Sequence, residues 1–428
     1  MGNVDAARAA NPALDAALRG YEQVERRYVE ELRAKGLAFA PRGAGAERRA
    51  GLRERLAQRG GAVRNAGASL SAGWLSPACV ECTGVGGSET FSTTFRCHRD
   101  CYFCFNHNQA DYDTFFDEGC PWEEGLERSA AENGRLACLG LTGGEPLLNL
   151  EASLAFLRRA GELFPQAHKR MYTSGDLLTA ESAAALREAG LDEIRFSVKV
   201  DDAPEMRGRV LAAMELARGV FDAVMVEMPV EPGTLSFMKG LFREFDRIGI
   251  DGIDLLEFCF PFCHWDEFAK RGFELRNPPF EVMYDYGYSG GLAVAGSEEE
   301  ALELMLWALD EGVRFGMHYC SLENKHRSEM RQRNERAGAM HPCVAFDEGD
   351  FFLKTAKVFG DDRVVARLLL EAAGCADFLE DAEEQSLAFA PRYLDALAGA
   401  PVTPAVCSLV YELEEDGGRL VDAGLALV

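Results

Sequence analysis

The 428-residue chain is short of positive charge, because 45 Lys and Arg residues stand against 70 Asp and Glu residues, for a formal charge of −25. Such a balance disfavours nonspecific attraction to nucleic-acid phosphates or anionic membranes, and we expect neither as a partner. The sequence also lacks an apolar run of the roughly 18 residues that a membrane-spanning helix needs. Its first residues show no basic segment followed by an apolar one. We therefore expect a cytoplasmic protein.

Hydrophobic residues are plentiful, at 47% of the chain, so a large core can form and wholesale disorder is excluded. The 13 cysteines are expected to be metal ligands and buried thiols, because a chain without a secretion signal rarely uses disulfides. Cys97, Cys101 and Cys104 have the spacing C-x3-C-x2-C. No fourth cysteine follows within a few residues, although a closed structural metal site takes four ligands. This pattern predicts a [4Fe–4S] cluster with one iron left open, and a zinc finger is the alternative.

A second motif follows some forty residues later, where an apolar stretch beginning at Leu139 ends in Gly143, Gly144, Glu145 and Pro146. Glycines let backbone carbonyls approach a ligand closely. The carboxylate of Glu145 can bind an ammonium group, and proline ends a strand. These residue types are thus compatible with close approach of a ligand and with an ammonium group beside Glu145.

Strands and helices alternate from residue 89 onward, which is typical of a parallel sheet or barrel. Ligands of such barrels bind at the carboxyl ends of the strands. The predicted strands are residues 89–95, 136–141, 169–173, 193–200, 223–230 and 252–258.

The two motifs, in this order and at this spacing, resemble those of the radical SAM superfamily over roughly residues 89–260. The resemblance implies a fold of the α/β class, a partial (β/α)6 TIM-like barrel. It also implies a [4Fe–4S] cluster whose open iron binds S-adenosylmethionine (SAM). Such enzymes cleave SAM reductively and abstract a hydrogen atom from their substrate.

The resemblance also assigns roles to single residues. Cys97, Cys101 and Cys104 would hold the cluster, and Phe103 would pack near the adenine of SAM. The methionine amino group of SAM would lie at the second motif, formed by Gly143, Gly144, Glu145 and Pro146. Its ribose or carboxylate would lie at the turn after the third strand, at Thr173 and Ser174.

Alternation along residues 193–200 places Arg195, Ser197 and Lys199 on the face opposite the apolar residues, which we expect to be the lumen face. Lys199 could neutralise the carboxylate of SAM, or it could project into water from the strand end. Glu227 interrupts an apolar strand, and a buried carboxylate is costly unless it is paired. It is expected either to bind ribose or substrate or to form an ion pair with Arg195.

A second metal site is a further prediction, because cysteine and histidine are competent ligands. Contact with substrate and plain packing are the alternatives. The pair Cys79 and Cys82 could likewise form half of a metal site or lie as two thiols in a turn. The candidates in the later loops are Cys259, Cys263, His264, Cys320 and Cys343.

The sequence thus predicts a radical SAM enzyme acting on a peptide, protein or small molecule, with a reducing partner such as ferredoxin or flavodoxin. Segments such as His318-Tyr-Cys320-Ser321 look like an uncharacterised group related to pyruvate formate-lyase activating enzyme, so activation of a glycyl-radical enzyme is one alternative. The other is a non-enzymatic zinc-binding module that uses Cys79, Cys82 and the thiols of residues 97–104.

We expect three segments in the chain. Residues 1–76 should form a helical N-terminal segment, packed on the barrel or free for a partner. Residues 77–275 should form the radical SAM core. Residues 276–428 should form a small α/β extension with the auxiliary metal or substrate site, including a hairpin that turns at Gly417 and Gly418.

Overall fold

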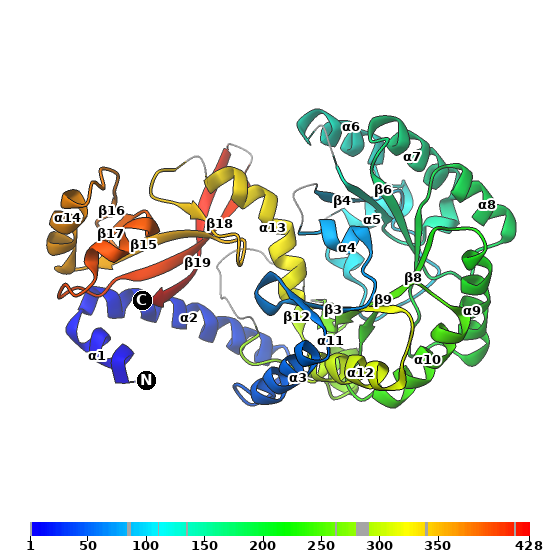
Figure 1. The fold of residues 1–428 in the computed structure, drawn as a ribbon, viewed down its shortest axis with the longest axis horizontal. Coiled ribbons are helices and arrows are strands. Elements are labelled where there is room, and N and C mark those ends of the chain that lie inside the picture. Colours follow the sequence, from blue (N-terminus) through cyan, green and yellow to red (C-terminus); the bar gives the residue numbers. More distant parts are fainter. Residues whose placement is uncertain are drawn as a thin grey trace. The chain divides into compact units, whose positions relative to one another are not determined.

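The computed structural model describes residues 2–83, 87–109, 111–133, 136–261, 263–279, 291–338, 341–414 and 417–428 (Figure 1). They divide into two compact units. The larger unit holds residues 38–279 and 291–325, and the smaller holds residues 2–37 and 326–428. These limits differ from the three predicted segments, and the division into a helical segment, a core and an extension stays a prediction.

The larger unit is built on a nine-stranded sheet with the order β2-β3-β13-β9-β8-β7-β6-β5-β4. Neighbouring strands from β4 to β13 are parallel, whereas β2 and β3 join antiparallel at one edge. The strands are β2 (Ala62–Arg64), β3 (Ser69–Ala72), β4 (Ser88–Ser92), β5 (Cys138–Thr142), β6 (His168–Thr173), β7 (Glu193–Phe196), β8 (Ala223–Val230), β9 (Gly252–Glu257) and β13 (Gly316–Cys320).

This sheet confirms the predicted partial α/β barrel, since its order has two ends and the described strands form an open barrel. Each of the six predicted strands overlaps one of β4 to β9. The strand β13 adds a seventh parallel strand beside β9. Its residues fall within the segment 276–428 that the sequence assigned to the C-terminal extension.

Helices lie round the outside of these strands (Figure 1). Apolar side chains such as Ile194, Phe196, Val224 and Val226 are fully buried in the core between strands and helices. Alternate positions of the same strands point to the lumen, and among them Glu193, Arg195 and Glu227 carry charged side chains. The outer helices are α6 (Trp122–Asn133), α7 (Leu150–Leu163), α8 (Ala180–Glu188), α9 (Pro204–Arg218), α10 (Leu235–Ile248) and α12 (Ser297–Glu311).

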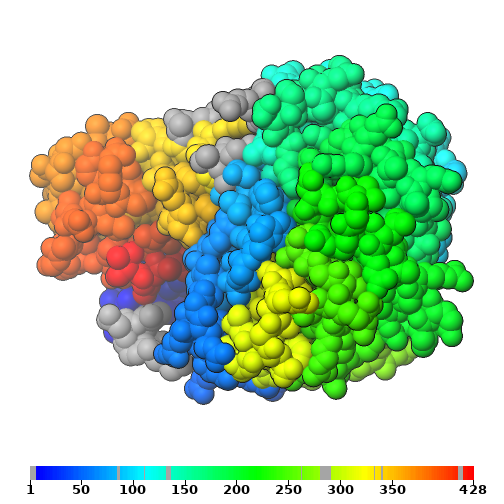
Figure 2. Space-filling view, turned by 45° about the vertical axis from the view of Figure 1, so that its right-hand side comes forward, coloured from blue at the N-terminus to red at the C-terminus, as the bar shows by residue number. Residues whose placement is uncertain are grey.

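The predicted helical N-terminal segment is divided between the two units. Helices α1 (Gly2–Ala10) and α2 (Pro12–Ala34) belong to the smaller unit, where Asn11 caps α2 and also donates a hydrogen bond to the carbonyl of Phe359. Helix α3 (Ala46–Gln58) belongs to the larger unit and lies beside α12, with an ion pair of 2.8 Å between Arg49 and Glu299 (Figure 2). Helix α3 therefore packs on an outer helix of the barrel.

Shorter elements complete the larger unit. They are β1 (Ala38–Phe39), α4 (Pro77–Glu81), the 3₁₀ helix η2 (Phe105–Asn108), α5 (Tyr112–Asp117), β10 (Cys259–Phe260), α11 (Trp265–Lys270), β11 (Glu274–Leu275) and β12 (Leu292–Ala293). Helix α13 (Leu322–Gly338) begins in the larger unit and ends in the smaller one.

The smaller unit contains an antiparallel sheet with the order β16-β17-β15-β18-β19, and β14 pairs with β15. Strands β18 and β19 pair along their length as a hairpin, but Gly417 and Gly418, the predicted turn, pair with Glu414 and Leu413 at the start of β19. Among the helices of the described residues, none has both the length and the apolar character needed to cross a bilayer. The elements are β14 (Ala345–Phe346), β15 (Leu353–Phe359), α14 (Asp362–Ala372), β16 (Leu379–Asp381), β17 (Ser386–Phe389), β18 (Ala405–Glu414) and β19 (Gly417–Leu427).

Candidate active site

The loop that carries the three predicted cluster cysteines follows β4 and is fastened to the Gly-Gly turn after β5. The backbone N–H of Gly144 donates to the carbonyl of Thr94 at 2.8 Å, and that of Glu145 donates to the carbonyl of Arg96 at 2.7 Å. A Cβ atom at Gly144 would overlap the carbonyl oxygen of Arg96. Gly143 has φ of +108°, a conformation that side chains disfavour. The two glycines are therefore needed for this close approach.

The thiols of Cys97, Cys101 and Cys104 are close enough for their charges to act on one another, and all three residues are partly buried. Burial raises the pKa of each thiol, to about 11 for Cys101, and the charge of Lys199 opposes this rise at all three. The backbone N–H of Arg99 points at the sulfur of Cys97 at 3.4 Å. Free thiols would thus stay protonated here, whereas bound iron would stabilise the thiolates.

Two side chains within the cysteine loop fasten it to the ends of β6 and β7. His98 Nε2 lies 2.8 Å from a carboxylate oxygen of Asp176, whose other oxygen lies 2.7 Å from the hydroxyl oxygen of Ser174. Arg99 forms an ion pair with Asp202. Two of the residues between Cys97 and Cys101 therefore help to hold the cysteine loop in position.

Glu145 is buried at the centre of this arrangement, with 1% of its surface exposed. Its oxygens accept hydrogen bonds from the hydroxyls of Thr173 and Ser174 at 2.7 and 2.6 Å. They also accept from the backbone N–H groups of Ser174 and Leu147 at 2.7 and 3.1 Å. The structure therefore brings three predicted residues together, and the carboxylate joins the ends of β5 and β6.

Arg195 faces the lumen, as the alternation predicted, and is 2% exposed. Its guanidinium forms ion pairs with Glu193 at 2.5 Å, Glu227 at 2.6 Å and Asp254 at 3.3 Å. The ion pair with Glu227, one of the two predicted alternatives, is thus present. Lys199 lies beyond the end of β7 and is half-buried.

Phe103 is half-buried in an aromatic group that begins in the cysteine loop. Its ring packs edge-on against Tyr102 at 5.1 Å and Phe258 at 5.8 Å between centroids. The hydroxyl of Tyr102 donates a hydrogen bond of 2.8 Å to Glu231. The motif therefore continues into a packed aromatic layer beside the thiols.

The predicted second metal set is not brought together in the part of the chain that the structure describes. Cys263 lies beside the cluster loop, with its sulfur 3.9 Å from the carbonyl of Cys104, and the ring of His264 packs against that of His107. The others are dispersed: Cys259 in β10, Cys320 at the end of β13 and Cys343 in the smaller unit.

A different group of ligand-type side chains does converge, and it consists of Cys79, Asp254 and His318. Cys79 was predicted as one half of a metal site, with Cys82. Asp254 was not singled out, although a carboxylate inside an apolar strand is the same signal that pointed to Glu227. The fastening residues His98 and Asp176 were also missed, because no local pattern marks a contact between two loops.

Residues 91–234 match the sequence profile of the radical SAM superfamily. The chain is 27% identical to a protein of Methanocaldococcus jannaschii provisionally assigned as a glycyl-radical enzyme activating enzyme, over 67% of this chain and 75% of that one. It is also 37% identical to GTP 3′,8-cyclase of a Synechococcus species, over 30% of this chain and 36% of that one.

Among solved structures, the chain is similar to anSMEcpe with bound AdoMet and the Cp18Cys peptide, at 15% identity and a TM-score of 0.36 over 54% of this chain and 62% of that one. It is also similar to SuiB of Streptococcus suis bound to the precursor peptide SuiA, at 14% identity and a TM-score of 0.33 over 48% and 42%. The chain thus spans less than two thirds of each of these solved chains.

Proposed function

Because the chain is a member of the radical SAM superfamily, an enzyme that uses a [4Fe–4S] cluster and SAM, we propose that Cys97, Cys101 and Cys104 are its cluster ligands. The observation that carries this proposal is the gathering of three thiols on one loop that is bonded to the Gly-Gly turn. Their donor chemistry fits the group, since iron–sulfur clusters are bound by cysteine thiolates. When bound, the cluster and SAM supply reductive SAM cleavage and hydrogen-atom abstraction.

The backbone from Gly143 to Pro146 is proposed to bind the amino group of SAM. All four hydrogen bonds that the carboxylate of Glu145 accepts come from within the protein, and a carboxylate has about four acceptor sites. Glu145 therefore acts on SAM mainly by fixing this turn and the turn after β6. The carbonyl of Gly143 is oriented in turn by the side-chain amide of Asn106, at 2.5 Å.

The remaining contacts to SAM are proposed for side chains at the ends of β6, β7 and β8. Lys199, whose charge acts on all three thiols, would neutralise the carboxylate of SAM. Thr173 and Ser174 would lie near its carboxylate and ribose, where their remaining acceptor sites would accept hydrogen bonds from ribose hydroxyls. One carboxylate oxygen of Glu227 accepts a hydrogen bond from Arg195, and its other oxygen would accept a hydrogen bond from a ribose hydroxyl. Phe103 would cover the adenine.

The protein's own task is to bind, orient and shield these groups, because the cofactor carries the bond-breaking chemistry. The substrate is proposed to be a peptide, a protein or a small molecule that enters at the carboxyl ends of the strands. A low-potential donor such as ferredoxin or flavodoxin would supply the electron, and the location would be the cytoplasm. We do not propose a second metal site at Cys259, Cys263, His264, Cys320 and Cys343, although Cys263 lies beside the cluster loop.

Lys199 gives a direct test of the proposed SAM site. In anaerobically reconstituted protein, Lys199→Ala should weaken SAM binding by about tenfold, equivalent to about 1.4 kcal/mol, because a carboxylate loses its partner. The matched control is Lys270→Ala, since Lys270 is an exposed lysine on α11 with 67% of its side chain accessible. Equal SAM affinity of the two variants would contradict the assignment.

Metal analysis separates the cluster from the alternative zinc module. The reconstituted chain should hold about four irons, and Cys97→Ala, Cys101→Ala or Cys104→Ala should each lower this content. Cys120→Ala removes a partly buried thiol elsewhere in the same unit and should leave the iron content unchanged. A colourless protein that binds zinc through these three cysteines and takes up no iron would refute the proposal.

Activation of a glycyl-radical enzyme is a second candidate function, because one relative carries that provisional assignment. The partner would then be a large protein that gains an oxygen-sensitive radical. Anaerobic purification of the tagged full-length chain from its own host tests this. A co-purifying protein that acquires a glycyl-radical signal with SAM would support the candidate, and a small-molecule or peptide product formed without a protein partner would exclude it.

A further inference from the structure

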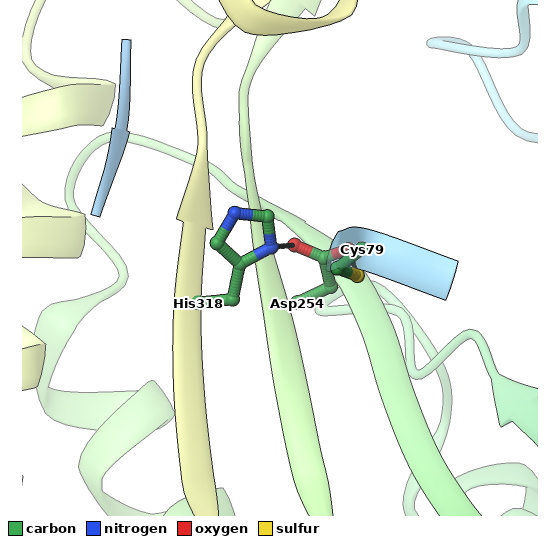
Figure 3. Close-up of side chains that lie close together, drawn as sticks. All are labelled: Cys79, Asp254 and His318. Atoms are coloured by element: carbon green, nitrogen blue, oxygen red, sulfur yellow. Dashed lines mark hydrogen bonds and ion pairs between the residues drawn. The ribbon is translucent and has the colours of Figure 1, made fainter. Parts of the chain in front are cut away.

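Three ligand-type side chains from three separate elements meet inside the barrel (Figure 3). Cys79 comes from the short helix α4, Asp254 from the middle of β9 and His318 from the middle of β13. Strands β9 and β13 are neighbours, and their register places Asp254 directly opposite His318. The meeting of the two strand residues is therefore built into the sheet, and α4 adds the thiol.

The three potential donor atoms lie within 4.8 Å of one another. Nδ1 of His318 is 2.7 Å from Oδ1 of Asp254, and the sulfur of Cys79 is 3.4 Å from Oδ2 of Asp254. Asp254 and His318 are 4% and 3% exposed. One thiol, one carboxylate and one imidazole form a donor set that suits Zn²⁺.

Two atoms of this group lack an aligned hydrogen bond despite their burial. They are Oδ1 of Asp254 and Nδ1 of His318, which approach as an ion pair but not with hydrogen-bond geometry. Buried polar atoms of this kind call for a partner. The other ring nitrogen, Nε2 of His318, lies 2.8 Å from the hydroxyl of Ser69. Such a bond on one imidazole nitrogen is typical of a histidine whose other nitrogen binds a metal.

The charges around the group favour a divalent cation. Glu193, Glu227 and Asp254 are carboxylates that surround Arg195, whose guanidinium also lies 3.4 Å from the sulfur of Cys79. Lys325 is close enough for its charge to act on Glu227 and Asp254. With Cys79 as a thiol, the three carboxylates are balanced by Arg195, Lys325 and the imidazolium of His318, which forms an ion pair with Asp254. Loss of one proton each from His318 and Cys79 on metal binding leaves two negative charges. A divalent ion would neutralise this excess.

We propose that Cys79, Asp254 and His318 bind one Zn²⁺ ion inside the barrel, separate from the iron–sulfur cluster. On binding, the thiol of Cys79 and the imidazolium of His318 each release one proton to solvent, and Nδ1 of His318 then contributes its lone pair. The ion joins α4 to β9 and β13. Three protein ligands leave a fourth position for water or another small ligand.

The test uses the full-length chain with Cys97→Ala, Cys101→Ala and Cys104→Ala combined, so that the cluster thiols cannot bind the probe. After removal of metal with a chelator, Co²⁺ is titrated and the thiolate-to-cobalt absorption is recorded. One Co²⁺ per chain is expected, with this absorption. Adding Cys79→Ala should abolish the band, whereas adding Cys120→Ala should leave it unchanged.

Ser69→Ala tests the orienting hydrogen bond and should weaken Zn²⁺ binding by roughly 10- to 100-fold without loss of the thiolate absorption. The absence of a thiolate band in the folded triple variant would overturn the proposal. So would a band that persists after Cys79→Ala.

A second measurement needs no substitution and therefore serves if the triple variant does not fold. In the reconstituted enzyme, metal analysis should find about one zinc per chain beside the iron. Bound Zn²⁺ should also protect Cys79 from alkylation, as read by peptide mass mapping, while Cys120 reacts at the same rate with and without zinc. Equal alkylation of Cys79 in both conditions would overturn the proposal. Because neither readout depends on SAM cleavage, failure of this site and failure of the proposed function are distinguishable.

Discussion

The hydroxyl of Ser174 donates a hydrogen bond of 2.6 Å to the buried carboxylate of Glu145, and this bond links the turn after β6 to the turn after β5. The same serine oxygen lies 2.7 Å from Asp176, which in turn contacts His98 in the cysteine loop. A continuous set of polar contacts therefore connects the Gly-Gly turn, the next strand end and the loop that carries the thiols.

Glu145→Gln should destabilise the protein, because the new amide presents donors to groups that are themselves donors. An unsatisfied buried polar group costs about 1–3 kcal/mol. Urea denaturation of the metal-free protein measures the effect, and SAM binding by the reconstituted variant should weaken as well. Glu151→Gln is the control, since Glu151 is exposed on α7 and should change the free energy of unfolding by less than about 0.5 kcal/mol. Equal stability of the two variants would contradict this role for Glu145.

Gly144→Ala should prevent the Gly-Gly turn from closing on the cysteine loop, because the added Cβ overlaps the carbonyl oxygen of Arg96. We expect loss of SAM binding and a lower unfolding midpoint. Gly161→Ala provides the opposite case, since Gly161 lies within α7 and its Cβ would meet no atom within 4 Å. Alanine there should stabilise the helix by up to about 1 kcal/mol. Thermal unfolding of the two variants should therefore shift in opposite directions.

Arg195→Gln should be strongly destabilising, because it leaves Glu193 and Asp254 buried without the cation they share. Removing one partner of a buried ion pair costs roughly 3–5 kcal/mol. The control is Arg314→Gln, which breaks an ion pair with Asp246 while 73% of the arginine side chain is exposed. That loss should cost less than about 1 kcal/mol. If denaturation curves show similar losses of unfolding free energy for the two variants, the ion pairs of Arg195 do not stabilise the protein as described.

Glu193 should make the stability of the metal-free protein dependent on pH in the acid range. Burial favours its neutral form, but the charge of Arg195 and hydrogen bonds from His168 and Ser76 lower the pKa of Glu193 to about 2. The unfolded value is about 4.3. Since the folded pKa is the lower one, the stabilisation is present above the unfolded pKa and is lost as the pH falls toward the folded pKa.

The difference in unfolding free energy between the unsubstituted protein and Glu193→Gln should therefore be constant near neutral pH and shrink as the pH falls. Urea denaturation at a series of pH values measures it. A difference that does not change with pH would show that Glu193 is not ionised in the folded state.

Much of the barrel was predictable because its signals are local. Apolar strands such as 223–230 and the Gly-Gly-Glu-Pro turn are visible in short windows, and β8 and β5 lie where these patterns placed them. The lumen position of Arg195 follows from strand alternation alone. The ion pair with Glu227 was foreseen because a carboxylate in an apolar strand needs a partner.

The features that the sequence did not predict arise from contacts between segments that are far apart in the chain. The short strands β2 and β3 were read as part of a helical segment, and their place in the sheet depends on β13, far away in the sequence. The convergence of Asp254 and His318 requires the parallel register of β9 and β13, which no local pattern encodes. The contact between His98 and Asp176 likewise joins two loops.

The central claim is that three cysteines hold a cluster that leaves one iron open for SAM. The most direct measurement is the formation of 5′-deoxyadenosine after anaerobic reconstitution, with dithionite as reductant and Cys97→Ala as the inactive control. The reconstituted chain should form 5′-deoxyadenosine from SAM, and the variant should form none. A fully reconstituted chain that forms no 5′-deoxyadenosine, with a fourth protein side chain bound to the open iron, would contradict the claim.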